Sequence, residues 1–405
     1  MNRVITLVGI FLLLGGMYLF SLSRNKIKFP IIIKGMIIQF IIALILVKIP
    51  LGRFVISKIS DVITVALSYG KEGIKFVFGS LALSSSPTGS IFAIQVLGNI
   101  VFTSALFGAL YYIGVLGFII KAIGRVVGKI LGTSKVESFI AVANMFLGHT
   151  DSPILISKYL GMMTKSEIMV VLVSGMGSMS ANIMIGYVAM GISMEYLLIA
   201  SALVPFGSII VSKILYPETE EVTEIDSINM DNKGSSENLI DALTEGASVG
   251  MRCAFAIGSS LIAIMGIVAL INGVLGFVGG FIGLDNLSLN MIFSYIFSPL
   301  GFIMGVSKEN IFLVGQLLGT KLTLNEFIAF RELGSILKEL DYRTGIILTI
   351  SLAGFANISS MGMCVAAISS LCPEKRGILS RLIFRAMIGG FIVSLLNSLI
   401  VGFII

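Results

Sequence analysis

The chain is poor in charge. Only 12% of its 405 residues are charged, whereas 56% are hydrophobic, and the mean hydropathy is +1.03. Soluble globular domains carry about 25% charged residues, so this composition excludes that class. The apolar runs are also too long for transmembrane β-strands, which alternate in segments of about ten residues. The sequence therefore predicts an all-α polytopic protein of the cytoplasmic membrane.

Several other patterns are scarce or absent. The three cysteines (Cys253, Cys364 and Cys372) are widely spaced and predict neither a disulfide framework nor a zinc site. Residues 128–133 have the wrong order for a phosphate-binding loop, and no dinucleotide fingerprint is present. The net charge of +6 comes from short basic clusters beside apolar spans, which does not indicate nucleic acid. We therefore expect no cofactor, no nucleic-acid partner and no enzymatic activity.

Apolar segments of about 20 residues, long enough to cross a bilayer as helices, predict about eight spans. They lie at residues 4–22, 30–49, 91–121, 166–190, 194–215, 245–275, 343–366 and 383–405. Basic residues Arg24, Lys26 and Lys28 separate the first two spans, so the positive-inside rule places this connection in the cytoplasm and the N-terminus outside. Residues 51–80 mix charged and apolar residues at helical spacing, which predicts interfacial helices.

A first interrupted segment lies at residues 136–163. An apolar stretch of twelve residues precedes the polar run Gly-His-Thr-Asp-Ser-Pro, and a second apolar stretch follows it. Twelve helical residues reach about 18 Å, only about half of a bilayer with its headgroups. Gly148 and Pro153 break the helix between the two stretches. The pattern predicts a re-entrant hairpin with its tip near the membrane midplane, where protein or water must cover it.

A second hairpin is predicted at residues 309–334, around Asn325 and Glu326. A span with a polar interruption follows each hairpin, at 177–182 and at 357–360. Paired broken helices in corresponding places of two halves indicate a transporter site. We therefore expect two structural repeats. The predicted segments are 1–121 (N-terminal spans, interfacial helices and a first scaffold span), 122–216 (first repeat with its hairpin), 217–241 (acidic linker) and 242–405 (second half).

Each hairpin tip carries a carboxylate, Asp151 in the first and Glu326 in the second. An ionisable side chain at membrane depth costs roughly 3 kcal/mol on insertion scales, so it usually persists because it binds something. Glu326 has no basic residue three or four positions away. A free carboxylate can accept two hydrogen bonds from a vicinal diol such as that of ribose. The alternatives are a proton-binding carboxylate and a salt bridge to Lys321 or Arg331, which requires a break in the helix.

Other polar residues surround these carboxylates. Asn144 and Ser178 can ligate a sodium ion beside carbonyls that a broken helix frees, although an interhelical hydrogen bond is the alternative. His149, the single histidine, can hydrogen-bond a heterocycle or take part in proton coupling. Phe355 adjoins the second polar run and can pack against a base. The amide and hydroxyl of Asn357 and Ser360 can complete the contacts to a sugar.

The sequence resembles the concentrative nucleoside transporter family along nearly its whole length. The matching motifs are 132–134 with Glu137-Ser138 and Ala143-Asn144, the Gly-x-Thr-acid tip, the Ser-Pro-x-x-Phe-x-x-Gly run 298–305, Lys321 with Asn325-Glu326-Phe327-Ile328-Ala329, and Gly354-Phe355-Ala356-Asn357-Ile358-Ser359-Ser360. The last two motifs together are specific.

This resemblance implies eight spans, two re-entrant hairpins and interfacial helices. It also implies a homotrimer in which a transport domain slides against a trimerisation scaffold in the lipid bilayer. By position, sodium would be bound by the side chains of Asn144 and Ser178 and by the carbonyls of Leu147 and Met179. The ribose would be held by Glu326, Asn357 and Ser360, and the base would be addressed by His149, Thr150 and Asp151 with Ile183 and Phe355.

The first tip departs from the family pattern. The family commonly has Gly-Gln-Thr-Glu-Ala-Pro, whereas this chain has Gly-His-Thr-Asp-Ser-Pro at 148–153. Aspartate is one methylene shorter, so a direct contact to the base can become water-mediated. Histidine does not reproduce the donor and acceptor of one planar amide. The base is therefore left open between purine and pyrimidine, and the coupling ion between sodium, which we favour, and a proton.

The resulting prediction is a cation-coupled symporter that imports nucleosides by an elevator-type mechanism. One alternative is a proton or ion exchanger that uses Asp151 and Glu326 as relays without an organic substrate. A hydrolase with Ser152, His149 and Asp151 as its catalytic groups is disfavoured, because three residues this close in one tip rarely form a nucleophile–base–orienter line.

Overall fold

The computed structural model describes residues 2–83, 91–223, 225, 236–281, 283–284 and 287–405, and every regular element in them is helical. Within these described residues, six helices or broken helices are long and apolar enough to cross a membrane, and they lie at Phe29–Val47, Phe92–Tyr112, Lys165–Ala189, Met194–Leu215, Leu239–Phe281 and Pro373–Ile404. The first predicted span is the shorter helix α1 (Asn2–Leu19), and the span predicted at 343–366 consists of two short helices. The fold is that of a multi-span helical membrane protein.

Two sets of helices repeat the same order. Before them come α1, α2 (Phe29–Val47) and α3 (Pro50–Phe78). The first set is α4 (Phe92–Gln95), α5 (Leu97–Tyr112), α6 (Val115–Leu131), α7 (Lys135–Ala143), α8 (Gly148–Asp151), α9 (Lys165–Gly177), α10 (Ala181–Ala189) and α11 (Met194–Leu215). The second set is α12 (Leu239–Phe281), α13 (Leu289–Ile303), α14 (Ile311–Thr323), α15 (Glu326–Ile336), α16 (Tyr342–Leu352), α17 (Ile358–Leu371) and α18 (Arg376–Ile404).

Equivalent contacts fix both repeats. Ser134, the N-cap of α7, donates to Glu167 in the first turn of α9. Ser307, which precedes α14, donates its hydroxyl to Asp341, the N-cap of α16, at 3.2 Å. The separations along the chain are 33 and 34 residues. In both repeats, a hydroxyl at the base of the hairpin is therefore tied to the start of the broken span that follows.

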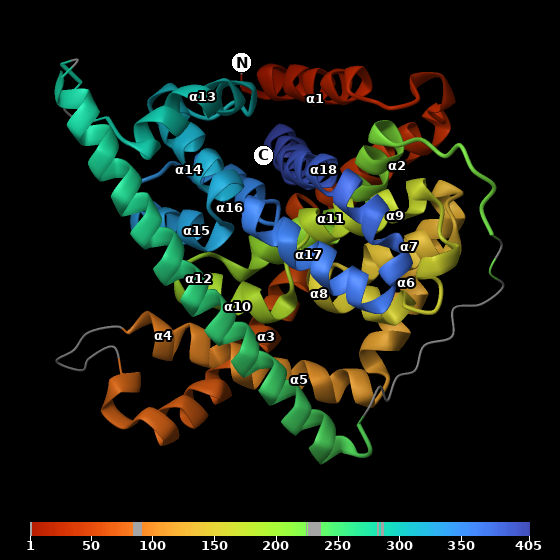
Figure 1. Ribbon diagram of the computed structural model, residues 1–405, viewed down its shortest axis with the longest axis horizontal. Coiled ribbons are helices and arrows are strands. Elements are labelled where there is room, and N and C mark those ends of the chain that lie inside the picture. Colours follow the sequence, from red (N-terminus) through yellow and green to blue (C-terminus); the bar gives the residue numbers. More distant parts are fainter. Residues whose placement is uncertain (1, 84–90, 224, 226–235, 282, 285–286) are drawn as a thin grey trace.

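The repeats are inverted with respect to each other. Just after α1 ends, Leu22 N donates to Leu215 O, the last residue of α11, at 3.1 Å. This end of α11 is joined to the base of hairpin 1 by the ion pair between Lys213 and Glu137. Near the N-terminal end of α1, Thr6 accepts a hydrogen bond from Arg343 Nη2 at 3.0 Å, beside the base of hairpin 2. The bases of the two hairpins thus lie beside opposite ends of α1, and Figure 1 shows α14 and α15 to the left of the centre and α7 and α8 to the right.

The hairpins differ in regularity. Hairpin 2 consists of two helices, α14 and α15. In hairpin 1 only the first half, α7, is a regular helix, whereas the predicted second apolar stretch forms the short helix α8 and the 3-10 turns Ser152–Ile156 and Leu160–Met162. Gly148 reverses the chain with φ +77°, and a Cβ there would lie 3.1 Å from Phe355 and Ser180. Such a backbone angle favours glycine.

Two segments predicted from the sequence differ from the structure, and a third falls partly outside the described residues. The span predicted at 91–121 ends at Tyr112, because Gly114 adopts a left-handed conformation and the chain turns into α6. The interfacial segment 51–80 is mainly one amphipathic helix of 29 residues, α3. The acidic linker 217–241 includes residues 224 and 226–235, which lie outside the described residues.

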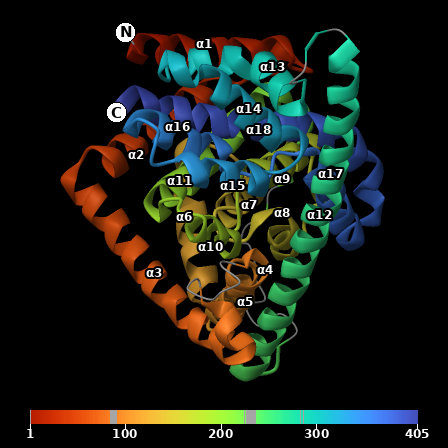
Figure 2. The ribbon, with the colours of Figure 1, turned by 90° about the vertical axis from the view of Figure 1, so that its left-hand side faces the viewer.

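Long helices frame the rest of the molecule. In Figure 2, α3 and α12 form two sides of a wedge, and α5 lies where they converge. Gly246 and Gly250 of α12 allow close packing on α5, since a Cβ at either would lie within 2.8 Å of atoms in the segment 100–104. Small residues of this kind permit close approach of helices in membranes. The discontinuous helices lie within the wedge.

Candidate functional site

The interruptions of the two broken spans meet in the interior. Phe355 N, between α16 and α17, donates to Ser178 O, between α9 and α10, at 3.0 Å. Gly354 has φ +128°, and a Cβ there would lie 2.9 Å from Gly177 O. Glycine is therefore required for the two backbones to approach. Backbone N–H and C=O groups at membrane depth need hydrogen-bond partners within the protein. The two breaks supply part of these partners to each other.

A cavity of about 440 Å³ lies beside this junction. Its lining includes all eight residues that the sequence predicted to contact substrate: His149, Thr150, Asp151, Ile183, Glu326, Phe355, Asn357 and Ser360. Hairpin 1, hairpin 2 and both broken spans contribute. Helix α12 closes the cavity with residues that the sequence reading missed, among them Arg252 and Cys253.

The carboxylate of Glu326 is 4% exposed and has two side-chain donors. Asn357 Nδ2 donates to Oε2 at 2.8 Å, and Tyr187 Oη donates to Oε1 at 3.2 Å. Asn357 also accepts from Ser360 N at 2.8 Å with its amide oxygen, so its amide group is oriented by the start of α17. The carboxylate retains lone pairs for further donors from a ligand.

Tyr187 was not predicted from the sequence. Its ring stacks on Phe330 with centroids 4.3 Å apart and is fully buried. Tyr187 lies within the apolar helix α10, and nothing in the surrounding sequence distinguishes a tyrosine that packs in the core from one that faces a polar site. Its position on the broken span after hairpin 1 is the one available signal.

The imidazole of His149 is 6% exposed and lies with its centroid 4.8 Å from that of Phe355, edge to face. Among the described residues, neither ring nitrogen has a hydrogen-bond partner. Thr150 Oγ1 donates to the adjacent Asp151 at 3.1 Å. Buried polar atoms are normally hydrogen-bonded, so two unpartnered nitrogens beside a cavity are suited to a polar ligand.

The predicted sodium ligands also gather at the first break. Asn144 is fully buried, donates to Ser174 Oγ at 2.8 Å and accepts from Ser152 Oγ at 2.7 Å. Ser178 Oγ donates to Gly175 O at 3.1 Å. The amide and hydroxyl oxygens each keep a lone pair, and such neutral oxygens suit a hard cation. Leu147 and Met179 flank the same turn segments, and Met179 is 1% exposed.

The hydroxyl of Ser152 is occupied by Asn144 and not by His149. It therefore lacks the adjacent base that an activated nucleophile requires. This geometry disfavours the hydrolase reading further.

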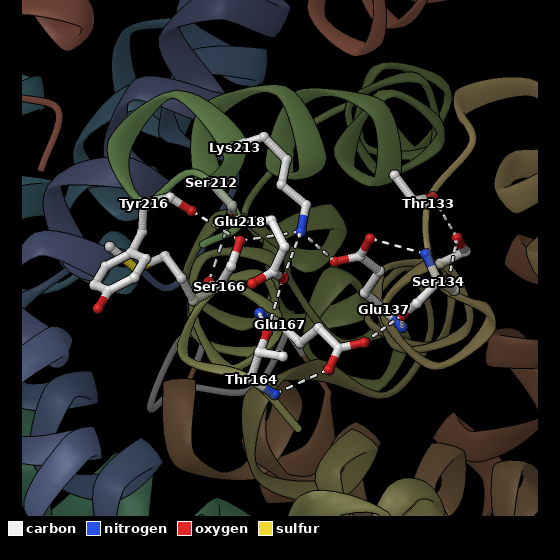
Figure 3. Close-up of polar contacts among 12 residues, drawn as sticks. Thr133, Ser134, Glu137, Thr164, Ser166, Glu167, Ser212, Lys213, Tyr216 and Glu218 are labelled. Atoms are coloured by element: carbon white, nitrogen blue, oxygen red, sulfur yellow. Dashed lines mark hydrogen bonds and ion pairs between the residues drawn. The ribbon is translucent and has the colours of Figure 1, made fainter. Parts of the chain in front are cut away.

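A buried ionic cluster anchors the base of hairpin 1 (Figure 3). Lys213 of α11 pairs with Glu137 of α7 at 2.6 Å, and their side chains are 7% and 4% exposed. Lys213 also donates to Ser166 at 3.0 Å, while Thr164 donates to Glu218 at 2.8 Å. The cluster joins the starts of α7 and α9 to the end of α11, so it fixes the base of hairpin 1 rather than its tip.

A second cavity of about 550 Å³ adjoins the first on one side. The two share five lining residues: Ser104, Leu147, Asp151, Asn182 and Val249. The second cavity extends to Tyr112, Lys158 and Glu245, near the start of α12. The central cavity therefore continues toward the end of the molecule where the linker enters α12.

Three family models match the chain in order. They are "Na+ dependent nucleoside transporter N-terminus" over residues 8–81, "Nucleoside recognition" over 93–194 and "Na+ dependent nucleoside transporter C-terminus" over 196–402. The chain belongs to the concentrative nucleoside transporter family. It is a multi-pass membrane transporter and not an enzyme.

Individual relatives agree with this family. The chain is 35% identical over 413 residues to nucleoside permease NupC of Helicobacter pylori, covering 100% of this chain and 98% of the relative. It is 31% identical over 418 residues to sodium/nucleoside cotransporter 1 of Mus musculus, covering 99% of this chain and 64% of the relative.

Solved structures of CNTnw share the fold. An inward-facing, substrate-bound state has a TM-score of 0.95 at 34% identity, covering 100% of this chain and 98% of that one. An outward-facing state of a doubly substituted CNTnw has a TM-score of 0.96 at 34% identity, covering 100% and 99%. CNTnw thus adopts both states that alternating access requires.

Proposed function

We propose that the protein is a sodium-coupled symporter that imports nucleosides. The observation that carries this proposal is the single cavity in which two hairpin tips and two broken spans bring together the Glu326 carboxylate, the Asn357 amide and the unpartnered His149 ring. Family membership supports the same substrate class.

In this proposal Glu326 accepts hydrogen bonds from the 2′- and 3′-hydroxyls of the ribose. Asn357 and Tyr187 already orient the carboxylate, so the ligand meets a preorganised acceptor. Ser360 completes the sugar contacts. A riboside that lacks one hydroxyl would leave a buried carboxylate oxygen short of a donor, which costs affinity.

The base lies in the half of the cavity formed by the first tip. The edge of Phe355 and the side chain of Ile183 pack against its faces, while His149, Thr150 and Asp151 face its polar edge. A neutral imidazole offers one donor and one acceptor. The base is therefore either a purine or a pyrimidine whose edge presents a complementary pair.

Sodium binds at the first break through Asn144 and Ser178, with the carbonyls of Leu147 and Met179. The ion orders the turn between α7 and α8, whose last residues line the substrate cavity. Ion and nucleoside therefore each raise the affinity for the other; such coupling is typically about 1–3 kcal/mol.

Transport proceeds by an elevator movement of the hairpins and broken spans against a scaffold within a homotrimer. The second cavity, which extends the central one toward the start of α12, is the proposed path of the nucleoside.

The test of the sugar site is Glu326→Gln, which keeps the shape of the side chain but removes its charge. We expect loss of nucleoside binding by calorimetry in detergent, with unchanged melting temperature. Glu332→Gln is the matched control, because Glu332 lies on the same helix, outside the central cavity, and is hydrogen-bonded to Gln316. Unchanged nucleoside affinity in Glu326→Gln would remove Glu326 from the site.

The coupling ion is tested in proteoliposomes with labelled uridine and adenosine under a sodium gradient or a proton gradient. Sodium-driven accumulation supports the proposal, and the ratio of the two substrates reports the base preference. Proton-driven accumulation would move the coupling role to His149 or a carboxylate. No uptake by folded protein under either gradient would contradict the nucleoside assignment and favour ion exchange.

A further inference from the structure

Lys321, in α14 of hairpin 2, is fully buried, with 0% of its surface exposed. Its ammonium donates to Ser351 O at 2.7 Å and to Ser394 Oγ at 2.7 Å, with Ala353 O at 3.5 Å. It also lies 5.6 Å from the ring centre of Phe391. The ammonium is thus surrounded by two backbone carbonyls, one hydroxyl and an aromatic face.

Glu326 is not the partner of this lysine. Among the described residues, no carboxylate oxygen lies within 4.0 Å of the Lys321 ammonium. The break at Leu324 and Asn325, which a local salt bridge would require, is present, but the lysine turns to neutral oxygens instead. The two carbonyl oxygens, of Ser351 and Ala353, stand at the C-terminal end of α16, where the helix dipole is negative, and the hydroxyl belongs to Ser394 of α18.

The same place in the first repeat is the proposed sodium site. Helices α9 and α16, of 13 and 11 residues, each follow a hairpin and end at Gly177 and Leu352, just before their breaks. Aligning these ends places Ala353 opposite Ser178, the proposed sodium ligand. The first hairpin contributes Asn144 there, ten residues after Ser134, and the second contributes Lys321, fourteen residues after Ser307. Both side chains reach the last turn of the adjoining helix before its break, because Asn144 donates to Ser174 Oγ of α9 and Lys321 donates to Ser351 O of α16.

We propose that Lys321 is a built-in cation of the second repeat. Its ammonium fills the position that corresponds to the sodium site of the first repeat, so the second break is permanently occupied and takes up no sodium. This inference rests on the proposed sodium site at the first break. It predicts that a single sodium ion is coupled to each nucleoside and that hairpin 2 stays attached to α16 when sodium leaves.

The built-in cation also explains why the two hairpins respond differently to sodium. Carbonyls freed at a break in a membrane helix need a partner. In the second repeat the lysine supplies it at all times, and the adjoining Glu326–Asn357 pair remains in place. In the first repeat the corresponding oxygens depend on a mobile ion, so only that half of the cavity responds to sodium.

The test uses Lys321→Ala and Lys321→Met in the full-length protein. Alanine opens a space that n-propylammonium, the missing end of the side chain, can fill, whereas methionine fills it without charge. We measure melting temperature in detergent with n-propylammonium or with choline at equal ionic strength. This readout needs neither nucleoside nor transport, so it is independent of the proposed function. Lys338→Met, an exposed site in the turn after α15, is the control.

We expect both Lys321 variants to melt below wild type and to lose uridine uptake at least tenfold. n-Propylammonium, but not choline, should restore stability and at least part of the uptake in Lys321→Ala and neither in Lys321→Met. Wild-type stability and uptake in Lys321→Met would overturn the proposal. Folded Lys321→Ala that no amine restores would also overturn it, because the charge would then not be the required feature.

Two further measurements remain decisive if the single variants do not fold. The reversal potential of wild-type uridine transport in sodium gradients should give one sodium per nucleoside, and a value of two would overturn the proposal. The double variant Lys321→Met/Glu326→Gln tests the rival hypothesis, in which Lys321 serves to neutralise the charge of Glu326. Recovery of stability in the double variant would support that rival role and overturn the built-in cation.

Discussion

Gly354→Ala should uncouple the two breaks that form the site. The residue has φ +128°, and an added Cβ would lie 2.9 Å from Gly177 O and 3.1 Å from Gly177 C, both backbone atoms that no side-chain rotation can move. A conformation reserved for glycine costs about 1–3 kcal/mol, and overpacking costs about 1–3 kcal/mol more. A total of at least about 2 kcal/mol corresponds to roughly a 30-fold change in an equilibrium constant.

The strain is relieved by separating the two breaks, which lengthens the bond from Phe355 N to Ser178 O. Both the base half and the proposed sodium site adjoin that bond. We therefore expect sodium-driven uridine uptake to fall at least tenfold and the melting temperature to fall by several degrees.

Gly362→Ala is the matched control for this prediction. Gly362 lies in α17, eight residues later, and an added Cβ there meets nothing within 4 Å. Alanine in a helix is favoured over glycine by about 0.5–1 kcal/mol, so this variant should melt at or above the wild-type temperature. Wild-type uptake and melting in Gly354→Ala would refute the argument that the site depends on the close approach of the two breaks.

Two further predictions concern hydrogen bonds and charges. Tyr187→Phe keeps the ring on Phe330 but removes the hydrogen-bond donor to Glu326. Loss of this hydrogen bond, worth about 1.5 kcal/mol, should weaken nucleoside binding roughly tenfold, as measured by calorimetry. Unchanged affinity would exclude a role for the hydroxyl. Glu137→Gln and Lys213→Met each leave a buried charge without its main partner and should destabilise by about 3–5 kcal/mol in chemical unfolding, whereas the double variant should lose less than the sum. Strictly additive losses would contradict the pairing.

The discontinuous elements could be predicted from the sequence because their causes are local. Gly148, Pro153 and a length too short for the bilayer indicate the first hairpin directly, and Asn325 with Glu326 marks the second. Polar residues in an apolar chain are rare enough that each one constrains the structure. The polar residues predicted to contact substrate therefore follow from the sequence, whereas Ile183 follows from the family resemblance, and all eight predicted residues line one cavity.

Other features have no local cause that the sequence displays. Gly114 is one of 45 glycines and lies between apolar residues, so the turn that ends α5 could not be distinguished from the interior of a long span. Tyr187 and Arg252 enter the site only because α10 and α12 pack against the hairpins. Contacts of this kind depend on tertiary packing, which one sequence does not specify residue by residue.

The unequal construction of the two hairpins follows from what stabilises each tip. Hairpin 2 returns as a regular helix, α15, because Asn325 caps it through a hydrogen bond from Ile328 N at 3.0 Å, and Lys321 holds its first half to α16. Hairpin 1 returns as 3-10 turns. Fewer helical hydrogen bonds stabilise that return segment, so opening it costs less free energy. Under the proposed function, sodium is therefore expected to order hairpin 1, while the proposed sugar contacts of hairpin 2 stay in place.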